Sequence, residues 1–350
     1  MVDLQTLLKD TIKRGASDLH ITYDSVPIVR VDGALVRLAQ HPMLTQHDCK
    51  MLVYSILNDK QKAKFERELE LDFSLAIPSL NRFRVNVHMQ RGSVEAAFRT
   101  ISTSVPTVQQ LGLPPAVTNI CRKKQGLIIV TGPTGVGKTS TLAAMVDYIN
   151  NKREEIIMII EDPVEYIHKN KMSVIKQREV FSDTHSFASA LRYVLRQDPD
   201  VIVVGEMRDL ETISTTLTAA ETGHLVLATL HTPDAAQTVD RMIDVFPPHQ
   251  QEQIRVQLAS SLEAVVSQLL LPRADGRGRV LATEVMICTP AVRNLIRNQE
   301  TEQLLTQMQT GYQYGMHTMD KSLKELLNQN IISQGLFDAY VKSIEASRSL

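Results

Sequence analysis

The feature that most constrains the fold is a series of short, almost entirely apolar segments in the second part of the chain. They lie at residues 127–130, 156–160, 201–204 and 225–230, and helix-length stretches separate them. Strands that are apolar along their whole length are buried on both faces, and strands that alternate with helices form parallel sheets. The pattern therefore predicts an α/β fold in which helices cover both faces of a parallel sheet.

The first hundred residues show a different pattern. Alternating apolar and polar residues at 82–88 and 94–100, with shorter strand-like pieces at 18–22 and 28–31, predict strands. Leu4, Leu7, Leu8 and Ile12 recur at helical spacing before them. This part of the chain is therefore expected to form a small mixed α/β unit that binds no nucleotide by itself.

A proline-containing stretch separates the two patterns. Pro106, Pro114 and Pro115 stand among Ser and Thr residues, which is typical of a linker. Near the other end, Thr289 and Pro290 have the order of an N-cap and a first helical residue, and the tail after them is expected to be mostly helical. The expected parts are an N-terminal domain at 1–100, a linker at 101–115, a core domain at 116–289 and a helical region at 290–350.

Composition excludes several classes of protein. The 350 residues contain 38 basic and 39 acidic side chains and are 43% hydrophobic, which is too apolar for a disordered chain. The balanced charge argues against a protein that mainly covers nucleic-acid phosphates, and the apolar runs are far shorter than the ~18 residues of a membrane span. We also expect no secretory signal. Three isolated cysteines, Cys49, Cys121 and Cys288, fit a reducing cytoplasm.

A glycine-rich segment follows the first apolar strand directly. Residues 132–139, GPTGVGKT, match G-x-x-x-x-G-K-[ST] and precede a helical run. Such a loop curls its backbone N–H groups around phosphate oxygens, its lysine reaches the β- and γ-phosphates, and its hydroxyl residue ligates magnesium. We therefore predict Lys138 as a phosphate ligand and Thr139 as a metal ligand. The predicted nucleotide-binding residues are Gly132, Pro133, Thr134, Gly135, Val136, Gly137, Lys138, Thr139 and Ser140.

Carboxylates and histidines flank the other apolar strands. Glu206 follows residues 201–204 and Glu161 follows residues 156–160, so both are expected at the edge of the sheet where ligands bind. Glu206 is predicted to hold magnesium through water or to orient the attacking water. For Glu161 the alternative is a structural role, as part of a turn around Asp162 and Pro163. His231 and His224 stand at the two ends of the strand at 225–230, and a structural role is the alternative for both.

Four motifs together resemble those of the type II/IV secretion ATPases. In chain order they are GPTGVGKT, IEDPVEYIH, LRQDPDVIVVGEMRD and ETGHLVLATLHT. The resemblance implies a PAS-like N-terminal domain, a flexible linker, and a RecA-like ATPase domain that uses ATP and Mg²⁺ in a homohexameric ring. It also implies that Glu206 is the Walker B acid, that Glu161 belongs to an acidic box, and that His224 and His231 belong to a histidine box.

Other segments are similar to the PilT-type branch of this family, the retraction ATPases of type IV pili. These are GASDLHIT, RFRVNVHMQRG and AVRNLIRN, the last with Asn298 where the branch has Glu. In a ring with sites between subunits, Arg84 and Arg99 of the N-terminal strands are candidate arginine fingers. Exposed charges that protect a sheet edge are the alternative.

The resemblance implies a cytoplasmic motor at the inner face of the cytoplasmic membrane, associated with it only through protein. It would drive pilus retraction and twitching motility by domain rotation, passed to a membrane platform protein, and would not bind nucleic acid directly. A paralogous retraction ATPase is a further expected partner. The alternatives are a PilU-like accessory ATPase, an extension or secretion ATPase, a RecA-type nucleic-acid translocase and a binding module that does not hydrolyse nucleotide. The extension branch carries a four-cysteine zinc motif, which three cysteines cannot supply.

Overall fold

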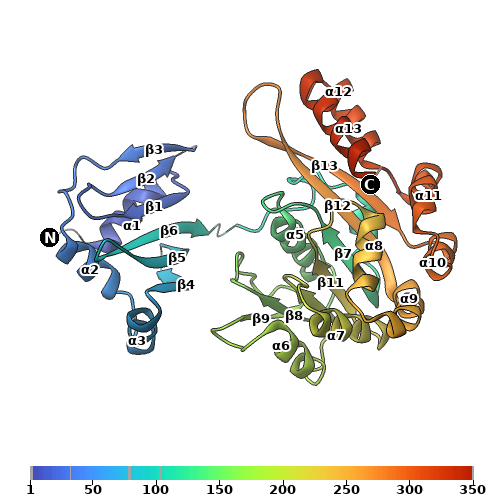
Figure 1. The fold of residues 1–350 in the computed structure, drawn as a ribbon, viewed down its shortest axis with the longest axis horizontal. Helices are drawn as coiled ribbons and strands as arrows, with labels where there is room; N and C mark the ends of the chain where they lie inside the picture. Colours follow the sequence, from blue (N-terminus) through green and yellow to red (C-terminus); the bar gives the residue numbers. More distant parts are fainter. Residues whose placement is uncertain (1–2, 32, 78–79, 102–103, 349–350) are drawn as a thin grey trace. The chain divides into compact units, whose positions relative to one another are not determined.

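The chain divides into two units (Figure 1). The computed structural model describes residues 3–31, 33–77, 80–101 and 104–348. Unit 1 contains residues 1–104 and 163–167, and unit 2 contains residues 105–162 and 168–350. The division between the units falls within the stretch 101–115 that the sequence predicts as a linker, of which Ser102 and Thr103 lie outside the described residues.

Unit 1 is a six-stranded antiparallel sheet with helices. The strand order is β3-β2-β1-β6-β5-β4. Along β5 the side chains of Phe83, Val85 and Val87 are fully buried whereas Arg84 is exposed, as the period of two in a strand requires. The elements are α1 (Leu4–Lys13), β1 (Asp18–Ile21), β2 (Ile28–Val31), β3 (Ala34–Arg37), α2 (Gln46–Tyr54), α3 (Asp59–Glu68), β4 (Glu70–Ile77), β5 (Asn81–Gln90) and β6 (Ser93–Ile101).

Unit 2 is built on a seven-stranded sheet in the order β13-β12-β7-β11-β10-β8-β9, in which only β13 runs antiparallel to its neighbour. The four apolar segments of the sequence form β7, β8, β10 and β11, so the predicted parallel sheet and the α/β class are confirmed. The strands are β7 (Gly126–Thr131), β8 (Ile156–Glu161), β9 (Val174–Glu179), β10 (Val201–Val204), β11 (Leu225–Thr229), β12 (Leu262–Pro272) and β13 (Arg279–Ile287).

Helices cover both faces of this sheet. In β7, Leu127 and Ile129 belong to one hydrophobic core, whereas Ile128 and Val130 belong to the other. The first core is shared with α6 (Phe187–Val194), α7 (Leu210–Glu221), α8 (Ala235–Asp244), α9 (Pro248–Ser261), α10 (Pro290–Arg297) and α11 (Leu304–Thr310), and the second with α4 (Pro115–Ile120) and α5 (Lys138–Asn150). The fully apolar strands therefore have the two-sided burial that their sequence predicts.

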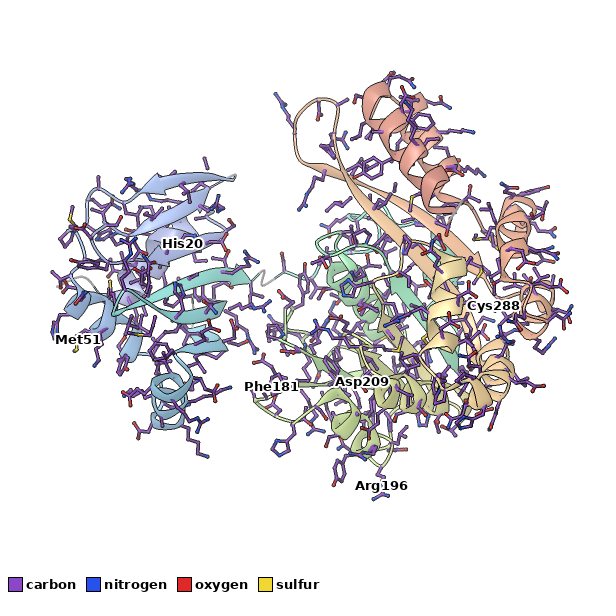
Figure 2. All side chains as sticks on the ribbon, in the orientation of Figure 1. His20, Met51, Phe181, Arg196, Asp209 and Cys288 are labelled. Atoms are coloured by element: carbon purple, nitrogen blue, oxygen red, sulfur yellow. The ribbon has the colours of Figure 1, made fainter. Side chains whose placement is uncertain are left out.

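The chain after β13 is helical, as predicted. Thr289 caps α10 by accepting the N–H of Val292, and Pro290 occupies the first turn. Short 3₁₀ turns at η1 (Thr301–Gln303) and η2 (Tyr312–Tyr314) flank α11, and α12 (Met319–Asn328) and α13 (Gln334–Arg348) follow. Figure 2 shows Cys288 between β13 and α10, where burial raises the pKa of its thiol to about 12. No helix in the described part of the chain is long and apolar enough to cross a bilayer.

Candidate active site

The glycine-rich loop at residues 132–139, called here the P-loop, connects β7 to α5. Gly132, Gly135 and Gly137 have φ angles of +137°, +84° and +92°, a region that side-chain-bearing residues rarely adopt. At Gly132 an added Cβ would also overlap the backbone oxygen of Gln268. Gly137 is the N-cap of α5 and makes no side-chain capping bond, so the cap residue does not compete with an anion for the start of this helix.

Lys138 is held inside the loop. Its side chain is largely buried, and Nζ donates to the backbone oxygens of Gly132 at 2.7 Å and Pro133 at 3.0 Å. Burial lowers the pKa of Lys138, and the carboxylate of Glu206 partly opposes that shift. A partly desolvated ammonium at the mouth of a glycine-rich loop is well suited to bind phosphate.

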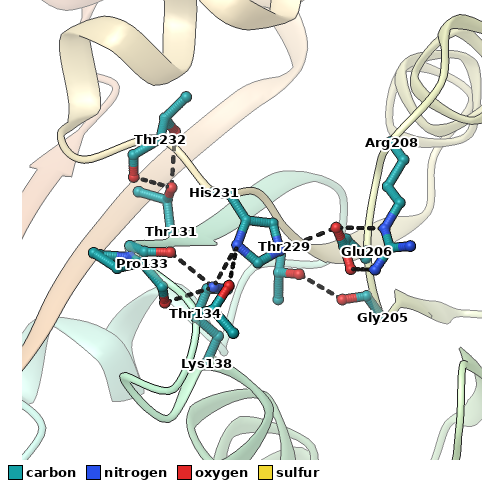
Figure 3. A network of polar contacts seen from close by, with 11 residues as sticks. Thr131, Pro133, Thr134, Lys138, Gly205, Glu206, Arg208, Thr229, His231 and Thr232 are labelled. Atoms are coloured by element: carbon teal, nitrogen blue, oxygen red, sulfur yellow. Dashed lines mark hydrogen bonds and ion pairs between the residues drawn. The ribbon is translucent and has the colours of Figure 1, made fainter.

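His231 links Lys138 to Glu206 (Figure 3). Its Nδ1 lies 3.2 Å from Lys138 Nζ and 3.5 Å from Thr134 Oγ1, and its Nε2 lies 3.0 Å from Glu206 Oε1. Because an ammonium only donates and a carboxylate only accepts, both contacts are satisfied by a neutral imidazole with its proton on Nε2. The histidine is therefore oriented by the two charged groups of the site.

Arg208 holds both oxygens of Glu206. Its Nε lies 2.7 Å from Oε1 and its second terminal nitrogen donates to Oε2 at 2.7 Å (Figure 3). Burial acts to raise the pKa of Glu206, but the hydrogen bonds and charges of Arg208 and His231 outweigh it, so the pKa lies below its ordinary value. A carboxylate offers about four acceptor sites, and these contacts take three of them. About one acceptor site of Glu206 is therefore left for a water molecule.

The strand order explains why these residues meet. β11 lies between β7 and β10, and all three run parallel. Their carboxyl ends therefore bring the P-loop, His231 and Glu206 together in that order at one edge of the sheet. Thr229 at the end of β11 donates to the backbone oxygen of Gly205, which fixes the chain just before Glu206. Asp209, labelled in Figure 2, then caps α7.

Other predicted residues of unit 2 occupy different positions. Glu161 ends β8, the strand beside β10, and accepts a hydrogen bond from Gln177 Nε2 at 3.2 Å. Thr139 and Ser140 lie in the first turn of α5. His224 precedes β11 at the opposite edge of the sheet, where Nδ1 lies 3.0 Å from the backbone oxygen of Ala219. The structure thus brings His231, but not His224, to the P-loop.

The two candidate arginines belong to unit 1. Arg84 on β5 and Arg99 on β6 face each other across the antiparallel pair, and both are exposed. Arg99 Nε donates to Asp18 Oδ1 at 2.9 Å. Like charges directly opposite each other repel, and the carboxylate of Asp18 offsets this repulsion in part by its contact with Arg99. The structure places them within the sheet of unit 1, and their role in the reaction remains a prediction.

The segment 291–298 forms α10 and its end. Val292 and Ile296 are fully buried, while Arg293 donates to the backbone oxygens of Ala259 and Ser260, both at 2.7 Å. Arg293 also contacts Glu263 at 2.6 Å, so this arginine satisfies carbonyls at the C-terminal end of α9. Asn298 is exposed and is the C-cap of α10. The departure from the family motif therefore lies on the surface.

Sequence reasoning missed two residues of the site. Arg208 stands within the segment GEMRD, so the sequence contains it, but nothing in the spacing shows that its side chain turns back onto Glu206. The other is Gln268 on β12, whose side chain contacts the P-loop from a distant part of the chain. Only the pairing of β12 with β7 shows its position.

The residues present fit a nucleotide and a divalent cation. An uncapped helix start, open space where a Cβ of residue 135 would lie, and a buried lysine form a cradle for phosphates. The Thr139 hydroxyl and the Glu206 carboxylate supply the oxygen ligands that Mg²⁺ prefers. The site can therefore bind a nucleoside triphosphate and direct a water molecule at it.

Comparisons with known proteins identify the family. A family model described as Type II/IV secretion system protein matches residues 1–277. The "Type IV pilus retractation ATPase PilT" of Pseudomonas aeruginosa is 49% identical over 333 residues, with 95% of this chain and 96% of the relative covered. The "Type IV pilus ATPase PilU" of the same species is 38% identical over 332 residues, with coverage of 95% and 88%.

A solved structure has the same fold. It is described as the pilus retraction motor PilT with bound ADP, and it aligns with a TM-score of 0.92, 47% identity and 96% coverage of both chains. The family model matches residues 1–277, which is most of the chain, and relatives that are 38% and 49% identical cover 95% of it. The chain belongs to the type II/IV secretion system protein family.

Proposed function

We propose that this protein is an ATPase motor that retracts type IV pili. The observation that carries the proposal is the continuous contact from the P-loop lysine through His231 to the carboxylate of Glu206. In such a cluster the lysine binds the triphosphate, and the carboxylate at the other end orients the attacking water. The 49% identity to a pilus retraction ATPase over nearly the whole chain supports pilus retraction, as opposed to pilus extension.

In this account Glu206 orients the attacking water. Its lowered pKa keeps it ionised at neutral pH, and Arg208 fixes both of its oxygens. Phosphoryl transfer depends mainly on positioning and charge stabilisation, so a preorganised carboxylate and a phosphate-binding lysine supply the main catalytic elements. His231 lies between them, where a change at the γ-phosphate is passed to Glu206. Glu161, next along the sheet edge, is proposed to act from the acidic box.

Mg²⁺ would be held by Thr139 and, through water, by Glu206. When bound, this ion neutralises charge on the β- and γ-phosphate oxygens. The contribution of the chain is the set of oxygen ligands and the cradle of N–H groups.

The motor is proposed to work as a homohexamer at the inner face of the cytoplasmic membrane. Arg84 and Arg99 are proposed to act on the nucleotide of a neighbouring subunit, and the linker at 101–115 to serve as the hinge of a rotation between the two units. The rotation would be passed to a membrane platform protein, with a paralogous retraction ATPase as a second partner. The exposed positions of both arginines support this assignment.

Two relatives of the motor are the alternatives. A PilU-like accessory role is disfavoured by identity, which is 38% to PilU and 49% to PilT over similar lengths. An extension role is disfavoured because the three cysteines are free and buried and cannot form a four-cysteine zinc site.

The Glu206→Gln variant tests the proposed chemistry. The amide keeps the size of the side chain but removes the negative charge, so kcat should fall by about 100-fold or more while ATP affinity stays within about threefold. Steady-state turnover and equilibrium binding of a non-hydrolysable ATP analogue measure the two quantities. Glu252→Gln, at an exposed position on α9, is the matched control and should behave as wild type. Normal turnover in Glu206→Gln would contradict the role of Glu206.

A further inference from the structure

We propose that Gln268 on β12 is a positioning residue for phosphate binding, an inference that rests on the proposed ATPase function, and that its side-chain amide holds the P-loop in its binding shape. The amide is almost completely buried, with 1% of the residue exposed. Its Nε2 donates to the backbone oxygen of Val136 at 2.8 Å, and its Oε1 accepts from Thr141 Oγ1 at 2.9 Å. One side chain therefore binds both the loop and the helix that follows it.

The pairing of strands places Gln268 there. β12 runs parallel to β7, and Ser267 pairs with Thr131, the last residue of β7. The next residues, Gln268 and Gly132, therefore lie side by side where the P-loop begins. The backbone oxygen of Gln268 lies so close to Gly132 that a Cβ there would overlap it. The backbone of Gln268 thus leaves no room for a side chain at Gly132, where the P-loop starts. Its side chain holds Val136 in the middle of the loop.

The contact with Val136 determines which way the loop faces. Each peptide unit of the loop carries its C=O and the following N–H in opposite directions. When Gln268 holds the C=O of Val136 toward β12, the N–H of Gly137 points the other way, to the side where phosphates bind. Val136 and the amide that it contacts are 8% and 1% exposed, so water is a poor replacement for a lost amide at this carbonyl. Without the amide, the peptide is expected to rotate or fluctuate and the cradle of N–H groups to lose its alignment.

The contact with Thr141 provides a matched comparison. Thr141 is also buried, and its hydroxyl bonds to the same amide, but its own backbone lies in α5 and does not line the loop. If Gln268 served only the packing of unit 2, loss of its bonds would lower stability without a selective loss of ATP affinity. If Gln268 positions the loop, loss of the bond to Val136 should weaken phosphate binding selectively.

The test compares Gln268→Met with Thr141→Val in the full-length chain. Gln268→Met keeps the length of the side chain and removes both bonds, whereas Thr141→Val keeps the shape and removes only the bond to the helix. We expect Gln268→Met to raise the KM for ATP and the Kd for a non-hydrolysable analogue by about tenfold, with kcat changed by less than about threefold. Thr141→Val should leave both constants within about twofold of wild type.

The thermal midpoint without nucleotide separates positioning from folding. Both variants lose buried hydrogen bonds and should have lowered midpoints, so affinities are compared at a temperature at which both are folded, and a loop-positioning role predicts that only Gln268→Met loses affinity. Gln268→Asn, which keeps the amide but withdraws it by one methylene from both Val136 and Thr141, is the second variant and should also raise KM. Wild-type KM in Gln268→Met or Gln268→Asn would overturn the proposal, and so would an equal rise in KM in Thr141→Val.

Discussion

At the scale of the residue, the site depends on how charged groups share a few atoms. Glu206 is contacted by an arginine two residues along the chain and by a histidine from the neighbouring strand. Charge-assisted hydrogen bonds of this kind are short and strong, and they favour the ionised form of the acceptor. The reactivity of Glu206 is therefore set by Arg208 as much as by its own position at the end of β10.

Replacing Arg208 by Ala should move the acidic limb of the kcat/KM profile to higher pH. In the wild type, burial raises the pKa of Glu206, but the contacts with Arg208 and His231 outweigh this effect and lower it overall. Without Arg208 the effect of burial gains weight, so Glu206 takes up a proton at a higher pH and activity is lost sooner on acidification. At pH values above this limb, Glu206 is ionised but no longer oriented by Arg208, which should reduce kcat by about tenfold.

Arg192→Ala is the matched control for this prediction. Arg192 pairs with Glu211 at 3.0 Å on the surface, where both side chains are more than half exposed. Its removal should leave the pH profile unchanged. An acidic limb that stays in place in Arg208→Ala would show that Arg208 does not control the ionisation of Glu206.

At the scale of the element, β12 is as important to the P-loop as the strand that precedes the loop. Gly132 follows β7 with φ of +137° and lies against the backbone of Gln268. This close approach requires a residue without Cβ, because both the backbone angle and the space exclude one. The first residue of the motif must therefore be glycine because of the neighbouring strand as well as because of the phosphate that the loop binds.

Gly132→Ala should destabilise unit 2 even without nucleotide. Strain in the backbone and the overlap with Gln268 together are expected to cost about 2–4 kcal/mol. Gly276→Ala, in the hairpin between β12 and β13, has φ of +71° and open space around it, so only the left-handed strain of about 1 kcal/mol remains. Urea unfolding of both variants measures the difference. Equal losses of stability would contradict the close approach between β12 and the loop.

Sequence reasoning predicted the elements whose signals are local. β7, β8, β10 and β11 are apolar throughout, and the P-loop is continuous in the chain, so both could be derived from neighbouring residues. The place of β12 beside the P-loop could not be predicted from neighbouring residues, because the hydrogen bond between Thr141 and Gln268 joins residues 127 positions apart. His231 could be favoured over His224 from the sequence, because His231 follows the strand at its carboxyl end, and a strand of five residues about 17 Å long separates the two.

At the scale of the whole molecule, the chain consists of two units of different architecture. Unit 2 contains the P-loop, His231 and Glu206, and unit 1 contains Arg84 and Arg99 on an antiparallel sheet. A motor needs such a division, because hydrolysis must change the arrangement of parts that are each rigid enough to transmit force. With 38 basic and 39 acidic residues, the chain carries no basic excess of the kind that binds anionic lipid headgroups.

Genetic complementation tests the central claim most directly. A bacterium that makes type IV pili but lacks its own retraction ATPase should be given this gene, with the Glu206→Gln variant as the matched inactive control. We predict that the wild-type gene restores twitching and reduces the number of surface pili, whereas the variant does neither. Restored pilus assembly in a strain that lacks its extension ATPase, with no return of twitching in the retraction mutant, would contradict the account.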